Sequence, residues 1–70
     1  MRHEVESAVV TRMSAPPYLP EVRVTMKSGS VWTFRQGLAG RTHLMASTHT
    51  SRHPEYSRAR EAARRALISQ

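Results

Sequence analysis

The segment Glu21-Val-Arg-Val-Thr-Met-Lys-Ser-Gly-Ser-Val-Trp-Thr-Phe-Arg35 decides the fold of this chain. Apolar and polar side chains alternate over residues 21–26 and again over residues 30–35, which is the period of a half-buried strand. The intervening Lys27-Ser-Gly29 is typical of a turn, because glycine readily takes the left-handed conformation that a three-residue hairpin loop requires. The segment therefore predicts a β-hairpin.

The length of the turn sets which side chains share a face of this hairpin. A two-residue loop would mix polar and apolar side chains on both faces. A three-residue loop closed by a bulge pairs Val24 with Trp32 and Val22 with Phe34, and we expect this register. One face then carries Val22, Val24, Met26, Trp32 and Phe34. The other carries Glu21, Arg23, Thr25, Val31, Thr33 and Arg35, with Glu21 opposite Arg35. This register assigns Trp32 and Phe34 to the core rather than to a platform for stacking bases.

A less regular alternation over residues 4–13 predicts a first strand. Its two faces carry Val5, Val9 and Met13 on one side, and Ala8 and Val10 on the other. The following residues 14–20 contain three prolines, which remove backbone donors and fix φ, so they predict a stiff loop.

Residues 36–40 predict a turn after the hairpin, and residues 41–50 are ambiguous. As a helix they would group Leu38 with Met45; as a strand they would place Thr42, Leu44, Ala46 and Thr48 on one face. We favour the strand, as a further partner for the hairpin.

From Pro54 onward the apolar period becomes that of a helix. Pro54 suits a first helical turn, and Glu55 lies where the helix dipole favours an anion. An apolar stripe within an arc of about 140° on a helical wheel is formed by Tyr56, Ala59, Ala62, Ala63, Ala66 and Leu67. The opposite side carries Ser57, Arg58, Glu61, Arg64 and Arg65, with Arg60 at the border. Glu61 can pair with Arg65 at i,i+4. We expect the alanine stripe to pack against the apolar face of the hairpin.

Together these elements predict one small α+β domain over residues 1–70. Its architecture is an antiparallel three- or four-stranded sheet with a C-terminal amphipathic helix packed on one face. Cysteine is absent, and no apolar run reaches the roughly 18 residues of a membrane span. No signal peptide is recognisable at the N-terminus, so we expect a soluble cytoplasmic protein.

Charge is the strongest compositional signal. Eleven basic and five acidic side chains give a net charge of +6, and ten of the eleven bases are arginine. Guanidinium groups suit phosphate and carboxylate oxygens, so this balance indicates an anionic partner. The densest cluster is Arg58, Arg60, Arg64 and Arg65. If residues 37–53 fold beside the helix, the cluster would be extended by Arg35, Arg41 and Arg52.

The residues that an enzyme or a metal site would need are missing. The chain has no aspartate, and no glutamate near residues 47–51 could orient His49 as a base for a neighbouring hydroxyl. His49 and His53 have a spacing that can bind a metal on a helix, but Pro54 follows at once. We therefore expect no enzyme activity, no cofactor and no bound metal.

Two known families share features of this chain. The hairpin, with its Lys27-Ser-Gly-Ser-Val31 turn and with Trp32 and Phe34 at alternating positions, resembles the KTSC domain over residues 5–35. The sequence Ala62-Ala-Arg-Arg-Ala-Leu67 resembles the end of the C-terminal helix of the double-stranded-RNA-binding domain. KTSC domains occur alone and as an appendage to a tRNA-charging enzyme. Both resemblances imply association with nucleic acid, and with RNA rather than DNA.

The sequence thus predicts a small, basic, non-enzymatic nucleic-acid-binding module that contacts phosphates through its arginine-rich helix. An alternative remains open: a small inhibitor or adaptor, of the type that phages and mobile elements encode, docking on an acidic surface of a host protein. Homodimerisation through an open sheet edge is compatible with both, and we expect no membrane partner.

Overall fold

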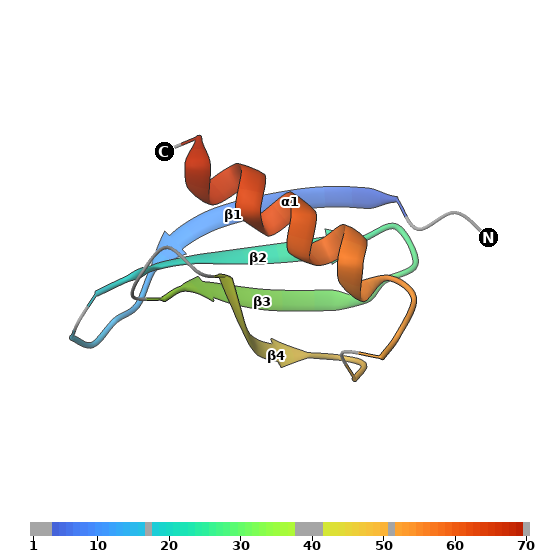
Figure 1. Cartoon of the computed structure of the whole chain (residues 1–70), viewed down its shortest axis with the longest axis horizontal. Coiled ribbons are helices and arrows are strands. Elements are labelled where there is room, and N and C mark those ends of the chain that lie inside the picture. The colour runs from blue at the N-terminus through green and yellow to red at the C-terminus, as the bar shows by residue number, and fades with distance from the viewer. Residues whose placement is uncertain (1–3, 17, 38–41, 51, 70) are drawn as a thin grey trace.

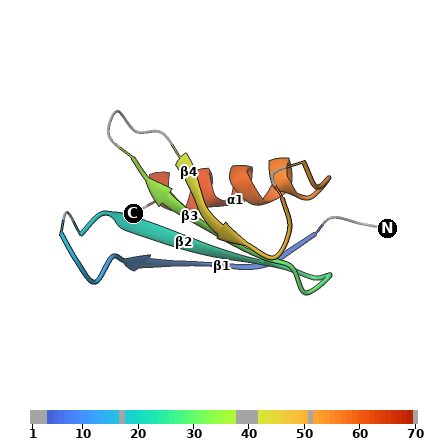
Figure 2. The same ribbon diagram turned by 90° about the horizontal axis from the view of Figure 1, so that it is seen from below.

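The computed structural model describes residues 4–16, 18–37, 42–50 and 52–69. Its elements, in chain order, are β1 (Val5–Arg12), β2 (Pro20–Met26), β3 (Val31–Gln36), β4 (Thr42–Ser47) and α1 (Tyr56–Ile68). The strands form an antiparallel sheet in the order β1-β2-β3-β4. Helix α1 lies across one face of this sheet, and Figure 2 shows the other face without a covering element in the described chain (Figures 1 and 2). The predicted α+β architecture is confirmed, with four strands.

The hairpin of β2 and β3 has the predicted register. Val24 lies opposite Trp32, and Val22 lies opposite Phe34. At the turn, Gly29 has a φ of 96°, in the left-handed region that glycine accepts without strain. The three-residue loop is therefore confirmed.

The hydrophobic core lies between this hairpin and α1. Its fully buried residues are Val22, Val24, Met26, Trp32, Phe34, Ala59 and Ala63. The fully buried large side chains all come from the sheet, whereas α1 contributes two fully buried alanines that let its backbone approach closely. Tyr56 and Leu67 of α1 are partly buried against this core. Because Trp32 and Phe34 are completely buried, their assignment to the core is confirmed.

A bulge in β1 changes the face on which Val5 lies. The pairing of β1 with β2 shifts register just after Val5, which lies opposite Met26 and packs against the core. Val9 lies opposite Arg23, on the face away from α1. The prediction that Val5 and Val9 share a face is wrong, because one extra residue in a strand exchanges its two faces beyond that point.

The fourth strand confirms the strand alternative for the segment after the hairpin, but a second bulge alters its faces. Leu44 lies opposite Phe34, whereas Ala46 lies opposite Thr33, so Met45 is the extra residue. Ala46 therefore lies on the face away from α1. The prediction that Leu44 and Ala46 share a face is wrong for the same reason as in β1.

Helix α1 begins slightly later than predicted. Glu55 is its N-cap residue, so Pro54 precedes the helix rather than lying in its first turn. The 13 residues of α1 carry four arginines. In the described ranges, no helix has the length and apolar character needed to cross a membrane. Most of the turn predicted over residues 36–40 lies outside the described residues.

Candidate functional site

Four arginines project from α1 into solvent. Arg58, Arg60, Arg64 and Arg65 are all exposed, while Ala59 and Ala63 on the opposite side are buried against the sheet. The helical period separates the two sets, because arginine and alanine stand at different angles around the helix axis. We call these four residues the arginine surface.

The arginine surface has two sides. On one side, Arg58 and Arg65 line a groove between α1 and β1. On the other, Arg64 lines a groove between α1 and the ends of β3 and β4, and Arg60 lies one turn before it. The first groove is completed by Val5, Glu61 and Ala62, and the second by Gln36, Thr42, Leu67 and Ile68. An anionic chain that crosses α1 could therefore contact arginines on both sides.

Glu61 lies between the two sides and pairs with one arginine of each. Its Oε1 accepts hydrogen bonds from Arg64 Nη2 at 3.0 Å and from Arg65 Nε at 3.1 Å. The hydrogen bond from Arg64, and then the one from Arg65, lower the pKa of Glu61 below its ordinary value of 4.5. The same contact raises the pKa of Arg64. The predicted pair with Arg65 is confirmed, and the pair with Arg64 is additional. All three groups are exposed, so the pairs add little to stability.

Arg58 and Arg60 form no ion pair with any residue that the structure describes. Along α1, four arginines and one glutamate leave three net positive charges. The guanidinium groups of Arg58 and Arg60 are therefore free to meet an external anion without breaking an internal contact.

Of the other three predicted arginines, one lies on the opposite sheet face, one lies in the loop before α1, and one lies outside the described residues. Arg35 lies opposite Glu21 on β2 and His43 on β4, on the sheet face turned away from α1. Arg52 is exposed in the loop before α1, and Arg41 lies outside the described residues. The idea that Arg35 joins the helix cluster is wrong, because alternation along β3 sends Phe34 toward α1 and Arg35 away from it.

His49 and His53 pack as aromatic rings at the end of the core. Their ring centroids lie 4.3 Å apart with an interplanar angle of 12°, and each ring lies near Trp32. Neither residue is in a helix, and within the described chain no three side chains form a metal-binding group.

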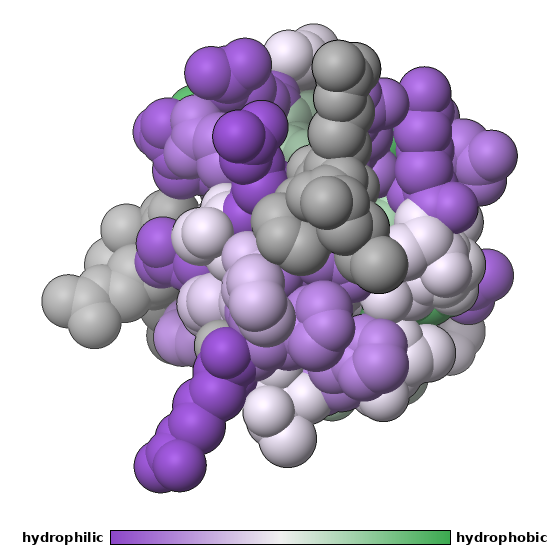
Figure 3. Space-filling model, turned by 90° about the vertical axis from the view of Figure 1, so that its right-hand side faces the viewer, coloured by the Kyte–Doolittle hydropathy of each residue, from purple (hydrophilic) through white to green (hydrophobic). Residues whose placement is uncertain are grey.

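Seen from the end of the molecule where the β2–β3 turn and the start of α1 lie, the surface is mainly hydrophilic (Figure 3).

Glu55 is a buried carboxylate that the sequence pattern did not reveal. Its exposed fraction is 1%, and its Oε2 accepts a hydrogen bond of 2.7 Å from the Ser28 hydroxyl in the β2–β3 turn. Its backbone N–H donates to Nδ1 of His53 at 3.2 Å. Glu55 thus links the hairpin turn to the start of α1. No local signal distinguishes it, because a glutamate beside a helix N-terminus is usually exposed.

Comparison of the chain with protein-family models, with curated proteins and with solved structures finds no match. The class that the fold defines is a small α+β domain, and the feature that stands out on its surface is the cationic side of α1. The resemblances to the KTSC and double-stranded-RNA-binding domains therefore stay predictions that rest on the quoted residues.

Proposed function

We propose that this chain is a small, non-enzymatic nucleic-acid-binding module that holds phosphates with its arginine surface. The observation that carries the proposal is that α1 carries four exposed arginines and one glutamate, which pairs with only two of them. Guanidinium groups bind phosphate oxygens well, and each such contact releases counterions from the nucleic acid.

The proposed contact is with the sugar–phosphate backbone rather than with bases. Reading single-stranded bases usually requires exposed aromatic rings. In this chain Trp32 and Phe34 are completely buried. We therefore expect binding with little dependence on base sequence. The preference for RNA over DNA rests on the two family resemblances.

The spacing of the arginines suits a backbone contact. Arg58 and Arg65 are seven residues apart, which is about 10 Å along a helix that rises 1.5 Å per residue. Successive nucleotides of one strand of a B-form duplex rise about 3.4 Å along its axis. A helix lying parallel to the axis of such a duplex would therefore place Arg58 and Arg65 about three base-pair steps apart.

The experiment that tests this proposal is a salt titration of binding to a fluorescent RNA duplex of about 20 base pairs, from about 50 to 300 mM salt. Wild type is compared with Arg58→Gln/Arg60→Gln/Arg64→Gln. The matched control is Arg12→Gln/Arg23→Gln/Lys27→Gln, which removes the same charge elsewhere. We expect the helix variant to lose at least about tenfold in affinity and the control far less. Equal losses, or no retention of RNA at low salt, would refute the proposal.

One observation favours the alternative of an acidic protein partner. The groove between α1 and β1 has apolar lining from Val5 and Ala62 beside Arg58 and Arg65. Such a groove suits an acidic peptide with apolar side chains. Under this alternative the chain is an inhibitor or adaptor. Capture of one acidic protein, together with no retention of nucleic acid at low salt, would favour it.

A further inference from the structure

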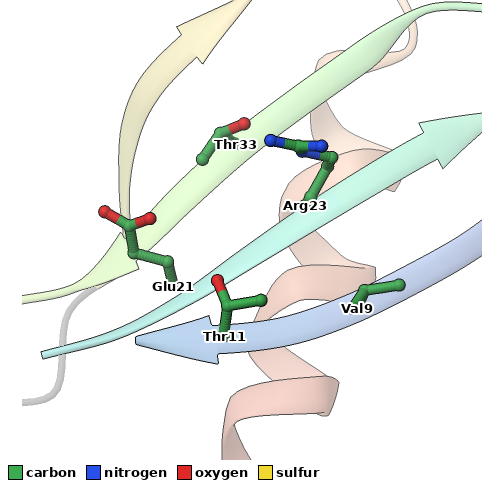
Figure 4. Close-up of a pocket in the computed structure, with 5 residues that line it drawn as sticks. All are labelled: Val9, Thr11, Glu21, Arg23 and Thr33. Atoms are coloured by element: carbon green, nitrogen blue, oxygen red, sulfur yellow. The ribbon is translucent and has the colours of Figure 1, made fainter. Parts of the chain in front are cut away.

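No described element covers the sheet face turned away from α1, on which Val9 and Arg23 are exposed, and opposite charges lie side by side on it. Figure 4 shows five of its side chains on β1, β2 and β3, around a shallow pocket, with α1 behind the sheet. One row of side chains across the strands consists of Val9, Arg23, Thr33 and Ala46. The next row contains Glu21 and Arg35, opposite one another on neighbouring strands.

The charges of Glu21 and Arg35 are not used inside the chain. In the part of the chain that the structure describes, neither residue forms an ion pair, although they are neighbours in the sheet. The Nε atom of Arg35 is buried and has no hydrogen-bond partner among the described residues. Glu21 and Arg35 are each partly exposed, so groups that approach the face from outside can still contact them.

A second copy of this chain supplies the matching groups. Two such sheets can pack face to face about a two-fold axis that is parallel to the strands and midway between β2 and β3. This operation keeps each row of side chains at the same height along the strands and reverses the order of the strands. As a result, β1 of one copy faces β4 of the other, and β2 faces β3. Glu21 of each copy then faces Arg35 of the other, and Val9 faces Ala46. We propose that the chain forms a homodimer through this sheet face.

The position of α1 favours this face over the edge of β1 as the dimer contact. In the face-to-face arrangement the helices lie on the outer sides, so the two arginine surfaces point in opposite directions. Pairing through the edge of β1 would bring the groove lined by Arg58 and Arg65 toward the same groove of the other copy. Each chain carries a net charge of +6, so repulsion between arginines disfavours edge pairing.

The resulting dimer has four layers, helix–sheet–sheet–helix, with an arginine surface on each outer side. This inference does not depend on the proposed function, because Glu21 and Arg35 are not part of the arginine surface. If the arginine surface binds nucleic acid, the dimer could hold two segments at once.

The test is the oligomeric state of nuclease-treated protein, measured by sedimentation equilibrium over a range of concentrations. With Arg23 unchanged, Glu21→Arg makes positions 21 and 35 both positive, and Arg35→Glu makes both of them negative. We expect wild type to dimerise and each variant alone to dimerise at least about tenfold more weakly. An equimolar mixture of the two variants should form a heterodimer, because each arginine at positions 21 and 35 then faces a glutamate of the other chain. Mixing cannot relieve repulsion within a chain, so this rescue is specific to the interface.

A third variant, Thr33→Arg, places a bulky charge at the centre of the face and should abolish the dimer. Far-ultraviolet circular dichroism shows whether each variant is folded, and the heterodimer test itself requires both charge variants to fold. A wild-type protein that stays monomeric overturns the proposal. A dimer that persists in all three variants also overturns it, because the contact must then lie elsewhere.

Discussion

Glu55 and Ser28 are 27 residues apart in the chain, yet the carboxylate of one accepts a hydrogen bond from the hydroxyl of the other. Burial of a carboxylate costs free energy unless hydrogen bonds replace its hydration. Here the β2–β3 turn provides such a donor at the point where α1 begins. This contact joins the hairpin to the helix by a polar link at the end of the apolar core.

Replacing Glu55 with alanine should lower the free energy of unfolding by about 2 kcal/mol, since hydrogen bonds to charged groups contribute about 1.5–3 kcal/mol. Urea unfolding followed by the fluorescence of Trp32, the single tryptophan, measures this change. The control is Glu6→Ala, at an exposed position of β1, which should change stability by less than about 0.5 kcal/mol. Equal effects of the two substitutions would contradict this account of Glu55.

Among the elements, the β2–β3 hairpin depends on the backbone conformation of one glycine. A Cβ atom built on Gly29 would meet no heavy atom within 4 Å. Any cost of a side chain there therefore comes from the φ of 96° and not from crowding.

Gly29→Ala should destabilise the protein by about 1 kcal/mol, because a left-handed backbone costs an alanine roughly 1–2 kcal/mol. Gly29→Asn should cost less, since asparagine accepts this conformation more readily. Urea unfolding of both variants checks the order. The explanation fails if alanine is tolerated as well as asparagine.

The strands also show where a period-2 pattern stops being informative. Alternation gave the correct register for β2 and β3, where no residue interrupts it. The pattern failed for Val5 and for Ala46, because each lies beside a bulge that adds one residue to its strand. A bulge depends on how the neighbouring strand pairs, so the composition of β1 and β4 does not reveal it.

For the molecule as a unit, the question is whether a polyanion responds to the total charge of +6 or to the arrangement of arginines on α1. Substitutions of Glu61 and Glu6 separate the effect of total charge from the effect of the arginine arrangement, because neutralising either glutamate raises the net charge by one. Glu61 pairs with Arg64 and Arg65, whereas Glu6 is exposed on β1. Only the first substitution releases guanidinium groups of the arginine surface.

Glu61→Gln should therefore strengthen binding to an RNA duplex by about threefold or more, while Glu6→Gln should change it much less. Fluorescence anisotropy at a fixed salt concentration compares the two variants with wild type. Equal gains in affinity would mean that net charge, and not the arginine surface, governs the interaction.

Much of the candidate site follows from the helical period. Arg58, Arg60, Arg64 and Arg65 were expected on the side opposite the alanines, and all four are exposed there. The period does not show that Arg58 and Arg65 line one groove while Arg64 lines another, because these grooves are formed with strands distant in the sequence. The helical period also does not indicate where Arg35 lies relative to the helix, because that position depends on which sheet face α1 covers.

Local spacing was enough to predict the β2–β3 hairpin with its register and an amphipathic helix with alanine inside and arginine outside, whereas it left residues 41–50 ambiguous between strand and helix. Each of these follows from a period of two or of about 3.6 residues and from turn chemistry, which operate between near neighbours. The two bulges, the burial of Glu55 and the separation of Arg35 from the helix arginines arise only when distant segments meet. Their physical cause is contact between elements that are distant in the sequence, and such contacts produce no repeating pattern in the sequence itself.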